Sequence, residues 1–303
     1  MIDAESLIFE YPGQRALDDV SFSIPHNSVT ALVGPNGAGK TTLMRCLCGL
    51  ERPLAGTIRI DGIDVIDEPR LSHERLGYLS DFFGLYDALS VRRVLSYAAS
   101  ANGKTGDLRN AVDETAARLR LSDRLGQPVG ELSRGLRQRV AIGQALIHDP
   151  GVLILDEPAS GLDPEARHDL AELFRSLQKS GMTLLVSSHI LAELEAYATE
   201  MLVIRDGRIV EQRALKETAP ARRQLRIEVG GVADNAVRML NNQADVHDVR
   251  VDRQRIFCEV SGGDAKQAQL LKDLVGADVG VINFSIVERD LQQSYLDSMQ
   301  KPR

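Results

Sequence analysis

The sequence contains no tryptophan, three cysteines and few aromatic residues, which make up 4% of its 303 residues. No uninterrupted apolar run approaches the roughly 18 residues that cross a bilayer, so a membrane-spanning helix is not expected. The odd number of cysteines, without metal-ligand spacing, predicts free thiols rather than a disulfide framework or a zinc site. These absences leave an ordinary globular protein as the expected class.

The sequence also lacks a basic excess and a leader-like start. Its formal net charge is −7, which argues against nucleic acid as the main partner. Residues 1–6 have neither the basic start nor the apolar run of a signal peptide, so the chain is expected in the cytosol. A length of 303 residues suits two domains.

Residues 34–42 match the phosphate-binding pattern G-x-x-x-x-G-K-[ST]. The apolar run 28–33 before them predicts a buried strand, and 43–47 after them predicts a helix. A glycine-rich turn at a helix N-terminus aims backbone N–H groups at a triphosphate. A turn that only packs the helix is the less favoured alternative. The residues predicted to bind ATP here are Asn36, Gly37, Ala38, Gly39, Lys40, Thr41 and Thr42.

Several side chains near this loop have predicted roles in the chemistry. Lys40 would place a positive charge between the β- and γ-phosphates, and the Thr41 hydroxyl suits Mg²⁺. The apolar run 152–155 predicts a central parallel strand that ends in two carboxylates. Asp156 is predicted to hold Mg²⁺, and Glu157 to polarise the attacking water as general base.

Three further features are open to two interpretations each. His189 follows a predicted strand at 183–188, where it could reach a γ-phosphate, although a lone histidine is more often structural. Tyr11, predicted on a loop at 10–14, could stack on adenine or simply pack. The segment Asp81–Tyr86 holds four large apolar residues, which fit a docking surface and a core cover equally well.

Residues 91 to about 148 have helical periodicity, with Val91, Val94, Leu95 and Ala98 on one face. Within this region Leu132-Ser133-Arg134-Gly135-Leu136 precedes an apolar helix predicted at Val140–Ile147. Ser133 is a natural N-cap, so a second helix N-terminus is offered to an anion.

Residues 5 to about 213 resemble the ATP-binding subunit of an ABC transporter. The resemblance rests on five motifs in order: the phosphate loop, the signature-like segment 132–136, the strand end 154–158, the segment 160–163 and His189. It implies an α/β P-loop NTPase fold, with a RecA-like core, an ABC β-subdomain and an α-helical subdomain at about 84–148. It implies ATP hydrolysis with Mg²⁺ and assigns Tyr11 to adenine.

The resemblance also implies an assembly. Two copies of the chain would form a homodimer around two nucleotides, with Ser133 and Gly135 of one copy on the γ-phosphate bound by the other. Integral membrane permease subunits would dock near Asp81–Tyr86, so that the chain lies on the cytoplasmic face of the membrane.

Three positions depart from the family pattern: Asp81, and Arg134 and Leu136 in the signature, where the family has a glycine and a glutamine. Asp81 stands where the family usually has a glutamine that senses Mg²⁺; an acid can bind Mg²⁺ through water but cannot donate a hydrogen bond when ionised. The signature is LSRGL rather than LSGGQ, with Arg134 in place of a glycine, and Arg134 could add a cation near the partner's nucleotide. The serine and the second glycine remain, so hydrolysis is still expected.

Beyond a domain at 1–213 and a polar linker at 214–223, residues 224–303 have the order strand, helix, strand, strand, helix, strand, with a last helix at Asp290–Met299. This order predicts a ferredoxin-like α+β domain. From Arg222 onward 12 basic and 12 acidic residues give a net charge of 12 − 12 = 0, which disfavours RNA binding. ABC-2-type exporter ATPases with a C-terminal extension are similar, which suggests regulation or dimer contact.

The function expected from the sequence is an ATPase that drives an ABC transporter, of the ABC-2 export type, through ATP-driven dimer closure. A soluble ABC ATPase of translation or DNA repair is one alternative; such proteins usually carry two ATPase domains or a long coiled-coil insertion. A nucleotide-dependent regulator that no longer hydrolyses ATP is the other, suggested by Asp81 and the altered signature.

Overall fold

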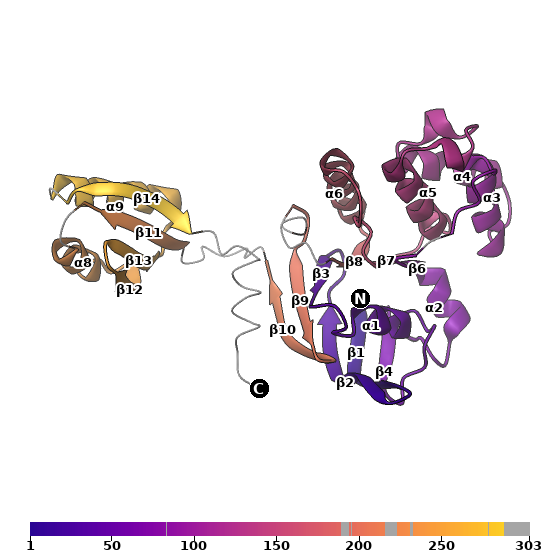
Figure 1. Ribbon diagram of the computed structural model, residues 1–303, viewed down its shortest axis with the longest axis horizontal. Helices are drawn as coiled ribbons and strands as arrows, with labels where there is room; N and C mark the ends of the chain where they lie inside the picture. The colour runs from indigo at the N-terminus through magenta and orange to yellow at the C-terminus, as the bar shows by residue number, and fades with distance from the viewer. Residues whose placement is uncertain are drawn as a thin grey trace. The chain divides into compact units, whose positions relative to one another are not determined.

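The chain divides into two units, Met1–Leu215 and Lys216–Arg303, in a computed structural model. The structure describes residues 1–82, 84–188, 194, 196–215, 223–230, 233–277 and 279–287. The placement of the two units relative to one another is not determined (Figure 1). Phe83, His189 and the predicted helix Asp290–Met299 lie outside the described residues.

The first unit begins with an antiparallel sheet in the order β2-β1-β4-β5. Its strands are β1 (Ile2–Tyr11), β2 (Gln14–Ile24), β4 (Ala55–Ile60) and β5 (Ile63–Asp64). Tyr11 pairs with Gln14 across a tight turn in which Gly13 has the left-handed φ of 81°. The prediction that Tyr11 lies on a loop is therefore wrong: the turn is tight enough for Tyr11 to be the last residue of β1.

A six-stranded sheet follows, in the order β10-β9-β3-β8-β7-β6. Its strands are β3 (Val29–Val33), β6 (Leu76–Leu79), β7 (Val152–Leu155), β8 (Thr183–Ser187), β9 (Glu200–Arg205) and β10 (Arg208–Ala214). The strands from β9 to β6 pair in parallel, and β9 and β10 form an antiparallel edge. Every residue of β3, β7 and β8 is buried, as expected for central parallel strands covered on both faces.

Helix α1 (Lys40–Leu47) packs between the two sheets of this unit. One buried cluster contains its residues Leu43 and Met44 together with Leu7 of the antiparallel sheet and Leu32 of the parallel strands. Helices α2 (Pro69–Arg75) and α6 (Pro164–Lys179) also contact strands of this unit. None of the described helices is both long and apolar enough to span a membrane.

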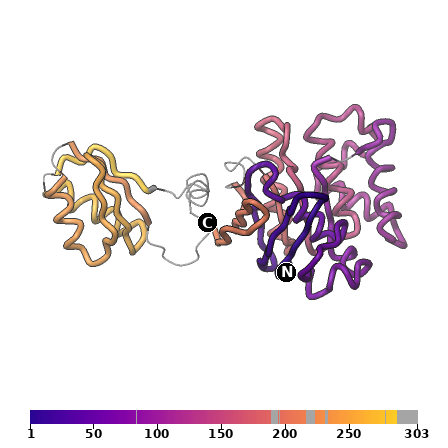
Figure 2. The backbone as a smooth tube through the Cα atoms, turned by 60° about the horizontal axis from the view of Figure 1, so that its bottom comes forward, coloured from indigo at the N-terminus to yellow at the C-terminus, as the bar shows by residue number. Residues whose placement is uncertain are grey.

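Three helices gather apart from the antiparallel sheet, on the far side of the parallel strands (Figures 1 and 2). They are α3 (Val91–Ala101), α4 (Leu108–Arg118) and α5 (Arg134–Leu146). The predicted apolar face of α3 is buried. Helix α5 begins at Arg134, six residues before Val140, where the sequence predicts its start. The helix starts early because Ser133 caps it there, and its first turn is helical although it has few apolar residues.

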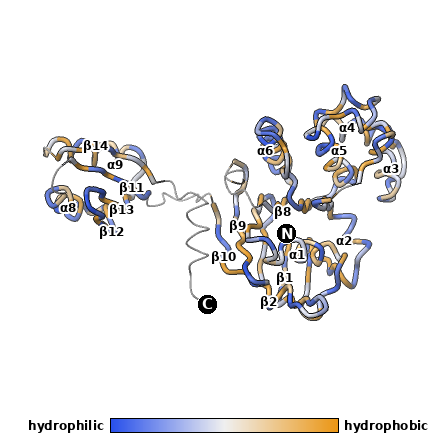
Figure 3. Tube along the Cα trace, viewed as in Figure 1, coloured by the Kyte–Doolittle hydropathy of each residue, from blue (hydrophilic) through white to orange (hydrophobic). Residues whose placement is uncertain are grey.

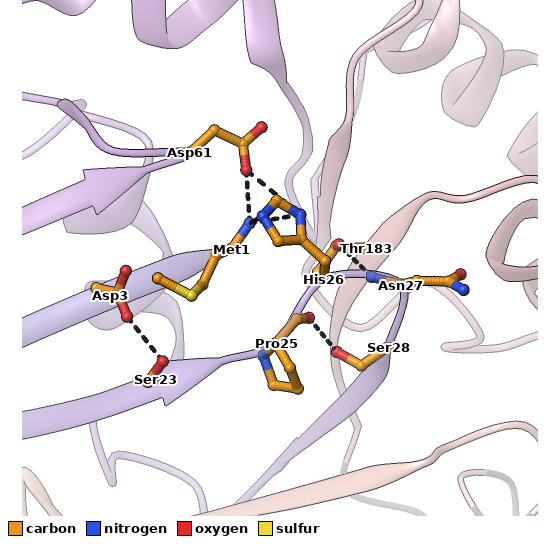
Figure 4. Close-up of polar contacts among 9 residues, drawn as sticks. All are labelled: Met1, Asp3, Ser23, Pro25, His26, Asn27, Ser28, Asp61 and Thr183. Carbon is orange, nitrogen blue, oxygen red and sulfur yellow. Dashed lines mark hydrogen bonds and ion pairs between the residues drawn. The ribbon is translucent and has the colours of Figure 1, made fainter.

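A cluster of polar contacts fixes the start of β1 and joins the two sheets (Figure 4). The amino group of Met1 donates to Asp61 Oδ1 at 2.5 Å and lies 3.0 Å from His26 Nδ1. One residue further, the Asn27 N–H donates to Thr183 Oγ1 of β8 at 2.9 Å. The antiparallel sheet is thereby anchored to the strand layer that carries the phosphate loop.

The described part of the second unit is an antiparallel sheet in the order β12-β13-β11-β14 with two helices. Its elements are β11 (Arg223–Val229), α8 (Asp234–Asn241), β12 (Val246–Asp252), β13 (Arg255–Val260), α9 (Gly263–Gly276) and β14 (Val281–Val287). The predicted order of strands and helices is confirmed up to residue 287. Hydrophobic and hydrophilic residues alternate along the traces of both units (Figure 3).

The two-residue alternation in the sequence predicts that Leu225, Ile227 and Val229 share one buried face of β11, and all three lie in the core of the second unit. The same alternation predicts a buried face with Ile282, Phe284 and Ile286 on β14. Phe284 packs against the core, whereas the prediction is wrong for Ile282 and Ile286, which are 70% and 45% exposed. Strand β14 lies at the edge of the sheet, and its register against β11 shifts near residue 282. A bulge at an edge turns a side chain away from the core, which the strict two-residue alternation could not predict.

Candidate nucleotide-binding site

A cavity of ≈ 380 Å³ opens where the phosphate loop, the end of β7 and the first hairpin meet. Residues from four separate segments line it: Tyr11, Gln14, Ala16, Asn36, Gly37, Gly39, Lys40, Thr41, Thr42, Asp81, Asp156 and Glu157. The structure thus brings together most of the site residues predicted from the sequence.

The phosphate loop needs glycine at two positions for different reasons. Gly39 has φ 105°, and a Cβ there would lie 2.6 Å from the carbonyl oxygen of Ala16. Gly37 has φ 79° with open space beside it, so its backbone is accessible from the cavity side. No side chain caps α1, so the first N–H groups of this helix remain available to an anion.

Lys40 is the first residue of α1 and is 8% exposed. Its Nζ donates to the carbonyl oxygens of Gly34 at 2.9 Å and Pro35 at 3.2 Å. Both acceptors are neutral and belong to the phosphate loop itself. The ammonium group therefore lies over the loop in the cavity, where its charge is not cancelled by a bonded carboxylate.

Asp156 follows β7 and is 1% exposed. The Ser187 hydroxyl donates to its Oδ1 at 2.6 Å, whereas Oδ2 has no hydrogen-bond partner among the described atoms. Burial raises the pKa of the Asp156 carboxyl, hydrogen bonding by Ser187 and Thr41 opposes this, and the nearby Asp81 carboxyl raises the pKa further. A buried carboxylate with an unsatisfied oxygen is the kind of group that a cation would stabilise.

No cluster of three or more His, Cys, Asp or Glu side chains suited to a metal ion occurs among the residues that the structure describes. This does not conflict with a magnesium site, because Mg²⁺ commonly uses one or two carboxylates and takes its remaining ligands from phosphates and water. Thr41, Asp81 and Asp156 all line the cavity, and Asp156 Oδ2 is unsatisfied. The donor set therefore fits Mg²⁺ held together with a nucleotide.

Glu157 lines the cavity beside Asp156 and has an unusual backbone. Its φ of 48° lies in the left-handed region, which is costly for a residue with a side chain. The Glu157 N–H donates to Ser187 Oγ at 2.8 Å, and its carbonyl accepts from the Ser160 N–H at 3.1 Å. These bonds hold the backbone of Glu157 in this conformation at the end of β7.

Tyr11 is 40% exposed at the cavity wall, and its ring packs edge-on against Phe9 with centroids 4.9 Å apart. That arrangement leaves ring surface available for stacking. Gln14 and Ala16 also line the cavity and were not predicted. The Pro-Gly turn was the available signal, because a tight hairpin places Gln14 directly opposite Tyr11.

Three of the predicted site residues that the structure describes are not part of this cavity lining. Ala38 is 4% exposed, and its N–H donates to the Pro35 carbonyl within the loop. Ser133 accepts from the Leu136 N–H at 3.3 Å and is exposed at the start of α5. Gly135 lies in the first turn of α5, where a Cβ would be 3.0 Å from Ala166 Cβ. His189 lies outside the described residues.

Comparison with known proteins decides what this site is. The family model described as "ABC transporter" matches residues 17–160, which include the phosphate loop and both carboxylates. The chain is 34% identical over 204 residues to the ABC transporter ATP-binding protein NatA of Bacillus subtilis, covering 67% of this chain and 83% of that one. The chain belongs to the ABC transporter family. It is an ATP-binding subunit and an ATPase of this family.

Other ABC relatives extend the comparison. The Nod factor export ATP-binding protein I of Burkholderia orbicola is 36% identical over 70% of each chain. The bacitracin transport ATP-binding protein BcrA of Bacillus licheniformis is 30% identical over 98% of this chain and 96% of its own. The similarity to BcrA therefore runs through the second unit as well as the ATPase unit.

Solved structures of ABC ATP-binding subunits have the same fold as the first unit. A structure described as the ATP-binding subunit of an ABC transporter is 32% identical, with a TM-score of 0.63, and the match covers 71% of this chain and 90% of that one. A nucleotide-free ATP-binding cassette gives a TM-score of 0.64 at 26% identity. The P-loop fold of ABC ATPases thus accounts for about 70% of the chain.

Proposed function

We propose that this ABC ATPase is the energy-coupling subunit of an ABC-2-type exporter. The observation that carries the proposal is the cavity in which the phosphate loop, Asp156 and Glu157 meet. Export is supported by the relatives, since one is an export protein by name and the relative that spans almost the whole chain is a bacitracin transport protein.

In this proposal each side of the cavity binds one part of ATP. Tyr11 stacks on the adenine ring, while the phosphate loop from Asn36 to Thr42 surrounds the phosphates with backbone N–H groups. Lys40 leaves its loop carbonyls and bonds the β- and γ-phosphates, because a charged phosphate oxygen is a stronger acceptor than a neutral carbonyl.

Mg²⁺ would be held by Thr41 and Asp156, with Asp81 acting through water, and would neutralise charge on the phosphates. Glu157 accepts the proton of the attacking water, and its fixed backbone directs the carboxylate into the cavity. His189 is proposed to contact the γ-phosphate on the basis of the family resemblance alone.

A homodimer completes each site in this proposal. Ser133 and Gly135 lie at the exposed start of α5, outside the cavity of their own chain, where they are accessible to a second copy. The Ser133 hydroxyl and the helix N-terminus then contact the γ-phosphate bound by the partner. ATP favours closure because these contacts exist only in the closed state.

The docking surface for integral membrane subunits is proposed around Asp81, Phe82 and Tyr86. The Phe82 and Tyr86 side chains are 86% and 74% exposed, so they do not cover the core of this chain. Large exposed aromatic side chains are typical anchors of protein interfaces. Docking there places the ATPase on the cytoplasmic face of the membrane.

Purification of tagged full-length protein from detergent-solubilised membranes tests the proposal. A stoichiometric polytopic membrane protein should co-purify and should be lost with Phe82→Asp. The control is Tyr97→Asp, which changes another exposed aromatic residue, 69% exposed on α3. Recovery of the native protein without any membrane protein, or equal loss with both variants, would contradict the proposed docking surface.

The second unit is proposed to be a ferredoxin-like accessory domain at 224–303, joined by a linker at 214–223 to the ATPase domain at 1–213. The observed order β12-β13-β11-β14 with antiparallel pairing and a βαββαβ succession supports this fold. Its proposed role is regulation or contact between the two copies of the chain.

A further inference from the structure

Arg134, the residue that replaces a glycine in the signature, contacts the loop after β7 in its own chain. Its Nη2 donates to the Ser160 carbonyl at 3.1 Å. The guanidinium group also covers Gly161 so closely that a Cβ there would lie 2.4 Å from Arg134 Cζ. Arg134 is thus held over residues 160–161 by one hydrogen bond and by packing against a residue without a side chain.

A continuous series of hydrogen bonds leads from this contact to the backbone of Glu157 and on to the carboxylate of Asp156. The Ser160 N–H donates to the Glu157 carbonyl at 3.1 Å. The Glu157 N–H donates to Ser187 Oγ at 2.8 Å, and the same hydroxyl donates to Asp156 Oδ1 at 2.6 Å. Arg134 therefore stands at one end of a bonded path that includes the backbone of the general base.

The backbone of Glu157 needs such restraint. A residue with a side chain at φ 48° persists only where its surroundings hold it there. Ser187 holds the N–H side from the parallel sheet, and Ser160 holds the carbonyl side from the loop. Arg134, the first residue of α5, donates to the carbonyl of the same Ser160 and so connects α5 to this loop.

We propose that Arg134 is a positioning residue, which links the N-terminus of α5 to Glu157 of the same chain through Ser160. The inference rests on the proposed function of Ser133 and Glu157. When Ser133 meets the partner's nucleotide, Arg134 transmits the position of α5 to the general base at the chain's own nucleotide. Hydrolysis in one site thereby depends on occupancy of the other.

The first test compares Arg134→Ala with Arg137→Ala in the full-length protein. Arg137 lies one turn further along α5 and bonds Asp87 instead of the loop. Arg134→Ala should lower kcat by about threefold to tenfold, the range for one hydrogen bond of ordinary strength. Binding of a fluorescent ATP analogue should change by less than about twofold, because Arg134 does not line the cavity. Arg134→Lys keeps a hydrogen-bond donor, so its kcat should fall less than that of Arg134→Ala.

Hydrogen exchange of the backbone amides provides a readout that does not depend on turnover. The Ser160 N–H, which donates to the Glu157 carbonyl, should exchange faster in Arg134→Ala than in the native protein. In Arg137→Ala its exchange rate should be unchanged. Unchanged exchange at Ser160 would overturn the inference even in a protein that hydrolyses no ATP. Faster exchange in a protein without turnover would instead contradict only the proposed function.

Mixed dimers then separate an effect within one chain from an effect on the partner. In the first mixture one chain carries Arg134→Ala and its partner carries Glu157→Gln, so the remaining general base shares a chain with the altered Arg134. In the second, both changes are in one chain and the partner is unaltered. Lower turnover in the first mixture alone supports the inference. Lower turnover in the second alone would mean that Arg134 acts on the partner's nucleotide, and would overturn it.

Discussion

The two units of this chain treat their polar groups differently. The first unit buries the ammonium group of Lys40 and the carboxyl of Asp156, and it holds Glu157 in a left-handed conformation beside them. In the second unit, Gln267 is the only buried polar side chain among the described residues. Its charged residues Arg226, Glu228 and Arg255 pair on the exposed side of the sheet.

This difference affects the free energy of folding of each unit. Burying a charge without a full set of partners is costly, and it is tolerated where a ligand later supplies the missing contacts. The first unit accepts that cost at the cavity, whereas none of the described charged side chains of the second unit is buried. The comparison therefore agrees with a nucleotide site in the first unit.

The largest expected effect tests the chemistry of the first unit directly. Glu157→Gln should lower ATP turnover by about 10²–10⁴-fold, because an amide cannot accept the proton of the attacking water. ATP binding should remain, since the amide keeps the size of the side chain. Phosphate release and binding of a fluorescent ATP analogue measure the two properties. Glu74→Gln, on the exposed side of α2, is the control, and undiminished turnover in Glu157→Gln would remove Glu157 from the mechanism.

A smaller effect is expected at the adenine side of the cavity. Tyr11→Ala should weaken ATP binding by about tenfold, as stacking of one base contributes about 1–3 kcal/mol. Tyr11→Phe keeps the ring and should bind ATP nearly as well as the native protein. Titration with a fluorescent ATP analogue compares the two variants. Equal weakening by both would indicate that the hydroxyl, and not the ring, makes the important contact.

A core substitution in the second unit should leave the chemistry intact. Leu225 is fully buried, so Leu225→Ala should destabilise the second unit by about 2–5 kcal/mol. Calorimetry should show an earlier unfolding transition, while phosphate release below that transition should change by less than about twofold. A loss of ATP turnover that accompanies the loss of stability in the second unit would contradict the division of roles between the units.

The smallest expected effect concerns the cost of the buried carboxylate. Asp156→Asn removes a charge whose Oδ2 is unsatisfied, so it should raise the apparent Tm in Mg²⁺-free buffer, by about 2–4 °C for each kcal/mol. The variant should also lose the stabilisation that Mg²⁺ and ATP give the native protein. Asp123→Asn, at a side chain that is 72% exposed, is the matched control. A lower Tm in Asp156→Asn would show that the carboxylate is satisfied without a cation.

Much of the site could be predicted because its residues occur in short, contiguous motifs. The phosphate loop and the pair Asp156–Glu157 each follow an apolar strand, and parallel strands bring their carboxyl ends to one edge of the sheet. The order of the strands in the sheet is implied by the family resemblance, because no single segment of the sequence indicates it. The cavity at that edge collects both motifs, as the sequence indicated.

The apolar pattern alone missed the start of α5, and two further features that it missed depend on contacts between distant segments. The early start of α5 follows from the Ser133 cap, which outweighs the weak apolar pattern of its first turn. Exposure of Ile282 follows from a bulge at a sheet edge, and the contact between Arg134 and Ser160 joins residues 26 positions apart. Local periodicity contains no information about any of these.

The central claim is that Ser133 completes the nucleotide site of a second copy, and ATP-induced dimerisation of the Glu157→Gln protein tests it most directly. Sedimentation velocity should find a dimer with Mg²⁺ and ATP, and only monomer when Ser133→Arg is added. Ser90→Arg is the control, because Ser90 also caps a helix, α3, so that this variant also loses one helix cap. A dimer that persists with Ser133→Arg would contradict the composite site.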